Sequence, residues 1–227
     1  MRKIVSLILL AIVALGIALC VMNIPFGAPK TKVGNHYINK GREETGAANI
    51  VTSVVLNYRG FDTLGEVTVL FIAAVGLSAV LATRKKKVEK EIEPSSMILN
   101  TGCRFLFPLI LFFGAYIFVH GHLTPGGGFQ GGAIIASAFL LTYLGCRGRR
   151  VSERRIKVTE SLSGLVFIVV GLLGLAVGGQ YFLNNFLPKG ILLSLFSAGI
   201  IPIIYIAIGF KVGSEIAGII DKLMEES

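Results

Sequence analysis

Tryptophan is absent from this 227-residue sequence, and cysteine and charged residues are scarce. Without Trp, only Tyr and Phe remain as aromatic anchors at a membrane interface. Cys20, Cys103 and Cys146 are isolated and form no Cys-x-x-Cys pair, which argues against a zinc site or a disulfide framework. No Ser-His-Asp set and no paired carboxylates are visible, so nothing supports an enzyme, and we expect neither a cofactor nor a bound metal in this chain.

The few charges are unevenly placed. Charged residues make up 15% of the chain and hydrophobic residues 53%, with a mean hydropathy of +0.75, which is typical of membrane-spanning proteins and not of soluble domains. The net charge of +9 is compatible with nucleic-acid binding, but the basic residues flank apolar runs without interleaved aromatic residues. They therefore indicate orientation in a lipid bilayer, and nucleic acid is not an expected partner.

Six apolar runs, some extended by their flanks, are long enough to cross a membrane, so the predicted fold class is an all-α polytopic membrane protein with about six transmembrane helices. The first run is longer than a typical signal-peptide core, which favours a retained helix over a cleaved signal. Pro202 within the last run is expected to kink it. The runs are 4–22, 64–81, 105–119, 133–144, 162–177 and 191–210, followed by a polar helical tail over 214–227.

Lysine and arginine counts predict the orientation. If the N-terminus is cytoplasmic, the four inner segments hold two, six, six and two of these residues, and the three outer loops hold five, none and one. This asymmetry obeys the positive-inside rule and would be lost with an odd number of spans. We therefore expect both termini in the cytoplasm of a prokaryotic cell, with the chain in its cytoplasmic membrane.

A polar connection over 23–61 follows the first run. Its prolines and glycines, up to Gly34, predict an irregular first part. Apolar residues then recur at helical spacing between Ile50 and Tyr58, which predicts a short amphipathic helix on the membrane surface or on a neighbour. A Val-rich strand is the alternative, but it would have no partner strand.

The stretch 118–132 joins two apolar runs that are short for a full membrane crossing, so its glycine-rich turn is expected to enter the membrane edge. Irregular backbone there must be buried in protein or face water, which predicts a packing joint or the rim of a polar path. His120 and His122 lack a third metal ligand; they are either proton-relay groups or ordinary helix-end histidines. The structural turn comprises Pro125, Gly126, Gly127, Gly128, Gly131 and Gly132.

Glu66 lies at the outer mouth of the second run. An ionisable group at membrane depth suggests ion or proton movement. However, Thr63-x-x-Glu66 also matches a capping box, which is a purely structural role. Lys157, Glu160 and Glu215 flank later runs and are interpreted as interfacial charge pairs.

Residues 120–132, His-Gly-His-Leu-Thr-Pro-Gly-Gly-Gly-Phe-Gln-Gly-Gly, and their flanking helices resemble the B subunit of Mrp-type multisubunit sodium/proton antiporters over about 97–220. Residues 57–66, Asn-Tyr-Arg-Gly-Phe-Asp-Thr-Leu-Gly-Glu, resemble the C-terminal membrane segment of the large A-type chain of the same antiporters. The chain is therefore interpreted as a fusion: an A-like module over 1–83, a charged cytoplasmic linker over 84–96 and a B-like module over 97–227.

The resemblance implies an accessory, non-catalytic membrane subunit of a sodium/proton-translocating module, within a complex I-related respiratory complex such as an archaeal membrane-bound hydrogenase or sulfane reductase. Its implied partners are other antiporter-like subunits and a redox arm, and Na⁺ and H⁺ are the implied transported ions. The candidates for an ion path are Glu66, Asp62, His120 and His122. Membership of a stand-alone antiporter and a purely structural anchor role are the alternatives. An independent carrier is disfavoured, since only one broken turn is visible.

Overall fold

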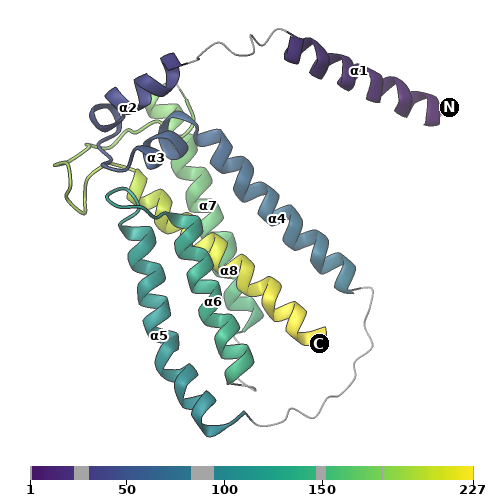
Figure 1. The fold of residues 1–227 in the computed structure, drawn as a ribbon, viewed down its shortest axis with the longest axis vertical. Coiled ribbons are helices and arrows are strands. Elements are labelled where there is room, and N and C mark those ends of the chain that lie inside the picture. The colour runs from purple at the N-terminus through teal and green to yellow at the C-terminus, as the bar shows by residue number, and fades with distance from the viewer. Residues whose placement is uncertain (1, 23–30, 83–94, 147–151, 180, 227) are drawn as a thin grey trace. The chain divides into compact units, whose positions relative to one another are not determined.

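The computed structural model describes residues 2–22, 31–82, 95–146, 152–179 and 181–226, and its chain divides into two compact units, 1–36 and 37–227 (Figure 1). These residues are helical or irregular, without a strand. The helices are α1 (Arg2–Met22), α2 (Thr31–Thr45), α3 (Ile50–Ser53), the π-helical turn η1 (Val54–Tyr58), α4 (Gly60–Ala82), α5 (Met97–Val119), α6 (Gly128–Gly145), α7 (Glu153–Gly178) and α8 (Ile201–Glu226).

Within the described residues, five helices are long and apolar enough to cross a membrane, namely α4 to α8. The helix α1 carries a shorter apolar stretch, Leu7–Leu19. These findings confirm the predicted all-α polytopic fold class. Most of the charged linker predicted at 84–96 lies outside the described residues, as does the start of the basic loop, 147–151.

The central helix of the second unit is α8, which packs against α6, α7, α4 and α5. Within its apolar span 61% of the residues are buried, compared with 6% in α4. The side chains of Ile201, Ile204, Ile208 and Val212 follow helical spacing and are 0–2% exposed, so they form one continuous core stripe. Figure 1 shows α8 alongside α6 and α7, while α5 and α6 form an antiparallel pair.

The last span differs from its prediction. Helix α8 begins at Ile201 instead of Ile191, and it continues without a break through the predicted polar tail to Glu226. Pro202 is therefore its second residue and does not kink it, because proline is well accommodated in the first helical turn, where no backbone N–H is needed. The shift moves Lys211 and Glu215 into the spanning segment.

The apolar residues 191–200 form turns instead of helix. Asn185 ties this segment together: its Oδ1 accepts hydrogen bonds from the Leu187 and Ile200 amides, and its Nδ2 donates to the Ala198 carbonyl. Leu193 and Ala198 have φ angles of 68° and 66°, which an α-helix excludes. Side-chain and backbone bonds within the fold thus override an apolar pattern that predicts a helix.

The polar connection over 23–61 is more helical than predicted. Gly34 lies inside α2, where irregular chain was expected, while 23–30 lies outside the described residues. The predicted helix over 50–58 is confirmed as α3 and η1, with its polar side inward. Thr52, Ser53 and Asn57 are buried, whereas Val51 is 67% exposed. Hydrogen bonds explain this orientation, because buried polar groups require partners.

Candidate functional site

The glycine-rich turn between α5 and α6 is closely packed against α8. Gly127, which caps α6, has a φ of 154° that other residues rarely adopt. A Cβ at Gly128 would lie 2.6 Å from the Cβ of Ile208, and one at Gly132 would lie 2.8 Å from the Gly209 carbonyl oxygen. Only glycine permits this approach of α6 to α8. Pro125 is exposed at the tip of the turn.

Helix α3 holds the turn in place. The Thr52 hydroxyl donates to the Gly121 carbonyl at 2.8 Å and also contacts the Tyr205 hydroxyl. Asn49 Nδ2 donates to the carbonyls of Gly121 and Thr124 at 2.9 and 3.0 Å, and the Asn49 amide donates to the carbonyl of His122 at 3.1 Å. Residues of α3 and its N-cap therefore provide hydrogen-bond donors for the backbone carbonyls of a turn more than 60 residues away in sequence.

The two histidines of this turn have different surroundings. His120 is half-buried, stacks on the Tyr116 ring and brings its Nδ1 within 3.0 Å of the Tyr116 carbonyl. His122 is fully buried, and neither ring nitrogen has a partner with full hydrogen-bond geometry. Burial lowers the pKa of His122; a backbone contact with Ser194 opposes this shift and the nearby His120 adds to it. His122 is therefore a neutral imidazole near neutral pH.

Glu66 and Asp62 lie on the uncovered side of α4, and both are exposed. Asp62 forms an ion pair with Arg59. The capping-box interpretation of Glu66 is wrong, because α4 begins at Gly60, which places Thr63 inside the helix, and the Thr63 hydroxyl donates to the Val55 carbonyl at 2.6 Å. The structure thus does not bring Glu66 together with the histidines.

The described part of the chain contains one buried charge cluster, which joins α7 to α8. Lys211 Nζ lies 2.9 Å from Glu160 Oε1 and 3.0 Å from Glu215 Oε2. Their side chains are 8%, 21% and 1% exposed, respectively. The ammonium of Lys211 also lies 5.0 Å from the centre of the Phe71 ring of α4. Ionisable groups at this depth are costly and characteristically mark ion or proton movement.

Further ionisable residues follow towards the C-terminal end of α8. Asp221 is 7% exposed, and Lys222 Nζ donates to the Ser78 hydroxyl of α4 at 2.5 Å. Towards the other end of α8, the fully buried Ile208 lies between Lys211 and Tyr205 along the helix. The cluster is thus followed by polar groups on one side and by a buried apolar residue on the other.

The interpretation of Lys157, Glu160 and Glu215 as interfacial pairs is corrected. Lys157 pairs with Glu153 on the exposed face of α7, but Glu160 and Glu215 converge on Lys211 inside the helix bundle. The Lys211-x-x-x-Glu215 spacing is the sequence signal that could have identified this pair, since residues four apart face one another on a helix. The hydropathy pattern gives no hint of this pair, because it predicts that the last span ends at residue 210, before Lys211.

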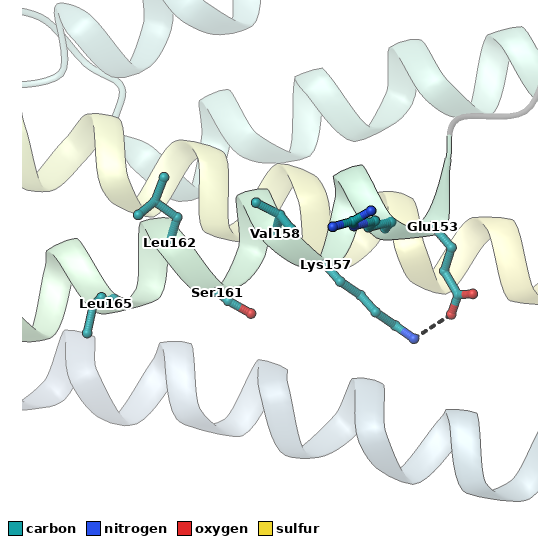
Figure 2. A pocket seen from close by; sticks show the side chains of 7 residues that line it. Glu153, Lys157, Val158, Ser161, Leu162 and Leu165 are labelled. Carbon is teal, nitrogen blue, oxygen red and sulfur yellow. Dashed lines mark ion pairs between the residues drawn. The ribbon is translucent and has the colours of Figure 1, made fainter.

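An open groove runs along the exposed face of α7 (Figure 2). Its lining comes from this helix alone, and its ion pair, Glu153 with Lys157 at 2.6 Å, is exposed. Within the described ranges no group of three or more His, Cys, Asp and Glu side chains is arranged to hold a metal ion. The groove is lined by Glu153, Arg154, Lys157, Val158, Ser161, Leu162 and Leu165.

The apolar helices around a buried charge cluster define a multi-pass membrane protein. The family described as "Domain related to MnhB subunit of Na+/H+ antiporter" matches residues 98–218, and the family MbhE, the E subunit of MBH, matches residues 1–96. Because the first match covers more than half of the chain, this protein belongs to the MnhB-related family.

Two solved structures are similar to this chain. One belongs to the membrane-bound sulfane sulfur reductase, an archaeal respiratory membrane complex, with 47% identity, a TM-score of 0.78 and coverage of 98% of both chains. The other belongs to the Mrp complex of Dietzia sp. DQ12-45-1b, with 26% identity, a TM-score of 0.69 and coverage of 98% of this chain and 26% of that one. Both are multisubunit membrane complexes, which confirms the resemblance to Mrp-type subunits.

Two curated proteins are similar to this chain in sequence. An uncharacterized protein of Methanocaldococcus jannaschii is 32% identical over 189 residues, 72% of each chain. The A/B subunit of a probable K(+)/H(+) antiporter of Rhizobium meliloti is 30% identical over 200 residues, 76% of this chain and 19% of that protein. This chain therefore corresponds to a small part of the larger A/B protein.

Proposed function

We propose that this chain is an accessory, non-catalytic membrane subunit of a sodium/proton-translocating, Mrp-like module in a complex I-related respiratory complex. The likeness to the sulfane sulfur reductase chain over nearly its full length supports the respiratory setting. The MnhB-related match supports the antiporter-like module. Redox chemistry, with any cofactor, belongs in this proposal to other subunits.

The observation that carries the accessory role is the uncovered surface of α4. Only 6% of the residues in the apolar span of α4 are buried within the chain, and the helix exposes Glu66 six residues after its first residue, Gly60. A carboxylate exposed to lipid is costly and rare in membrane-spanning helices. A second subunit that covers α4 would shield Glu66 from lipid. The chain is therefore proposed to function inside a larger assembly.

The division into an A-like module (1–83), a linker (84–96) and a B-like module (97–227) is part of this proposal. The two family matches meet between residues 96 and 98, next to the proposed linker. The bonds of Asn49 and Thr52 to Gly121 join the two modules, which supports their working as one subunit.

Glu66, Asp62, His120 and His122 remain the proposed ion-path residues at the outer side of the protein. Glu66 and Asp62 face outward on α4, where a partner subunit would complete the path. Na⁺ and H⁺ are the proposed ions. The turn residues from Pro125 to Gly132 are proposed to be structural.

Purification of the tagged, full-length chain from its native membrane, followed by identification of co-purifying proteins, tests this proposal. We expect antiporter-like membrane subunits together with a redox arm. Recovery with antiporter subunits alone would support a stand-alone antiporter instead. Sodium-dependent proton transport by the chain alone in vesicles would contradict the accessory role and favour an independent carrier.

A further inference from the structure

The charge cluster of Glu160, Lys211 and Glu215 contains one more carboxylate than it has ammonium groups. Two carboxylates share a single ammonium, so with every group ionised the cluster carries a net negative charge. Glu215 is 1% exposed, its Oε1 is fully buried, and neither of its oxygens has a hydrogen-bond partner among the described residues, although Oε2 lies 3.0 Å from Lys211 Nζ. An excess buried charge without hydrogen bonds is strongly unfavourable.

Among the described residues, Lys211 is the cation that pairs with Glu160 and Glu215, and the next cation on α8, Lys222, donates instead to Ser78 of α4. On α7, the group that faces the cluster is Glu160, and on α4 it is the Phe71 ring, with Ser78 further along. Helix α6 contains no Asp, Glu, His, Lys or Arg. The charged residue of α5, Arg104, is exposed, as are Asp62 and Glu66 of α4.

A proton is a better occupant of this site than a metal cation. Lys211 already places a positive charge 3.0 Å from Glu215, which repels a second cation. Hard cations also require several oxygen ligands, and within the described residues no group of three or more His, Cys, Asp and Glu side chains could hold one. A proton on the carboxyl of Glu215 neutralises the excess charge and needs no ligand shell.

We propose that Glu215 is a proton-binding site in the membrane interior, with Lys211 as a switch between Glu160 and Glu215. When Glu215 is neutral, Lys211 neutralises Glu160. When the proton leaves Glu215, Lys211 moves towards the new carboxylate; both contacts are within 3.0 Å, so the movement is small. In this proposal the proton passes to water at the end of α8 that carries the polar Asp221 and Lys222, and not past the buried apolar Ile208 on the other side of Lys211. Coupling of this step to ion transport rests on the proposed function above.

Infrared difference spectra of the assembled complex, recorded between acidic and alkaline buffer, test the protonation directly. We expect one carboxylic acid C=O band that is lost in Glu215→Gln. Glu160→Gln should abolish the same band with Glu215 still present, because Lys211 then neutralises Glu215 alone. Lys211→Met should strengthen carboxylic acid absorption. Glu153→Gln is the control, since its exposed pair with Lys157 lies outside the cluster.

An unchanged band in both Glu215→Gln and Glu160→Gln would overturn the proposal. Disappearance of the wild-type band on addition of sodium would also overturn it, because the site would then bind a cation. In vesicles, Glu215→Gln should remove the pH dependence of sodium-driven proton flux. Failure of the wild-type complex to transport would contradict the proposed function, whereas the infrared result stands independently of transport.

Discussion

The hydroxyl oxygens of Thr52 and Tyr205 lie 2.6 Å apart, and this buried contact joins α3 to the central helix α8. The same Thr52 hydroxyl reaches the carbonyl of Gly121 in the glycine-rich turn. One side chain thus connects α3, the glycine-rich turn and the central helix α8.

Thr52→Val should destabilise the protein by ~1–3 kcal/mol, because it leaves the Gly121 carbonyl and the Tyr205 hydroxyl buried with fewer partners. The measurement is the thermal stability of the purified complex. Thr142→Val is the matched control, since the Thr142 hydroxyl bonds within its own helix, to the Ala138 carbonyl. Equal losses in both variants would argue against the connecting role of Thr52.

Gly132→Val should prevent α6 from approaching α8, because its Cβ would lie 2.8 Å from the Gly209 carbonyl oxygen. Gly102→Val is the control, because a Cβ at Gly102 of α5 meets nothing within 4 Å in this chain. The amount of each variant in the membrane and in the purified complex is the readout. Normal assembly of Gly132→Val would show that the two helices can separate without harm.

His122 should make the stability of the complex pH-dependent. Burial lowers its pKa below the usual value of 6.5, so on acidification the unfolded chain takes up a proton that the folded chain does not. Stability is therefore expected to be greatest above the unfolded-state pKa of 6.5 and to fall as the pH decreases from there through the lower pKa of the folded state. Melting temperatures in acidic and neutral buffer should show a smaller acid loss for His122→Gln than for wild type. The exposed His36 serves as control, and His36→Gln should keep the wild-type loss.

Glu66→Gln should reduce sodium-dependent proton flux while the complex remains assembled. The substitution preserves size and hydrogen bonding but removes the charge and the titrating proton. Thr63 is not a cap partner, so no helix cap is lost. Flux is compared in vesicles that hold equal amounts of complex, with Glu43→Gln as an exposed control outside the spanning helices. Equal flux in wild type and Glu66→Gln would remove Glu66 from the proposed ion path.

The predicted orientation is tested by cysteine labelling. Cysteines at Gly34 and Ile191, both exposed, should react with an impermeant reagent from outside the cell, and one at Arg155 should not. The basis is the excess of Lys and Arg in the predicted inner segments. External labelling at Arg155 would contradict cytoplasmic termini.

Several features were predictable because they depend on local composition. The long apolar runs identified α4, α5 and α7 as spanning helices, and the spacing of apolar residues identified the helical segment at 50–58. The glycine-rich stretch predicted a turn between two helices, and it lies between α5 and α6. These features follow from lipid insertion and backbone preferences, which act over short distances in sequence.

The buried charge cluster was not predictable in the same way. Hydropathy treats 191–210 as one run, but Asn185 stabilises turns up to Ala198 and so delays the start of α8. This delay moves Lys211 into the spanning segment, where it meets Glu160 from another helix.

The amino-acid sequence by itself determined the membrane class, most spanning helices and the glycine-rich turn, because the hydrophobic effect and backbone sterics depend on neighbouring residues. Only the tertiary structure decided that the polar face of α3 points inward and that Glu160, Lys211 and Glu215 share one buried site. The reason is that buried polar groups must find partners, and here those partners come from other helices, far away in sequence.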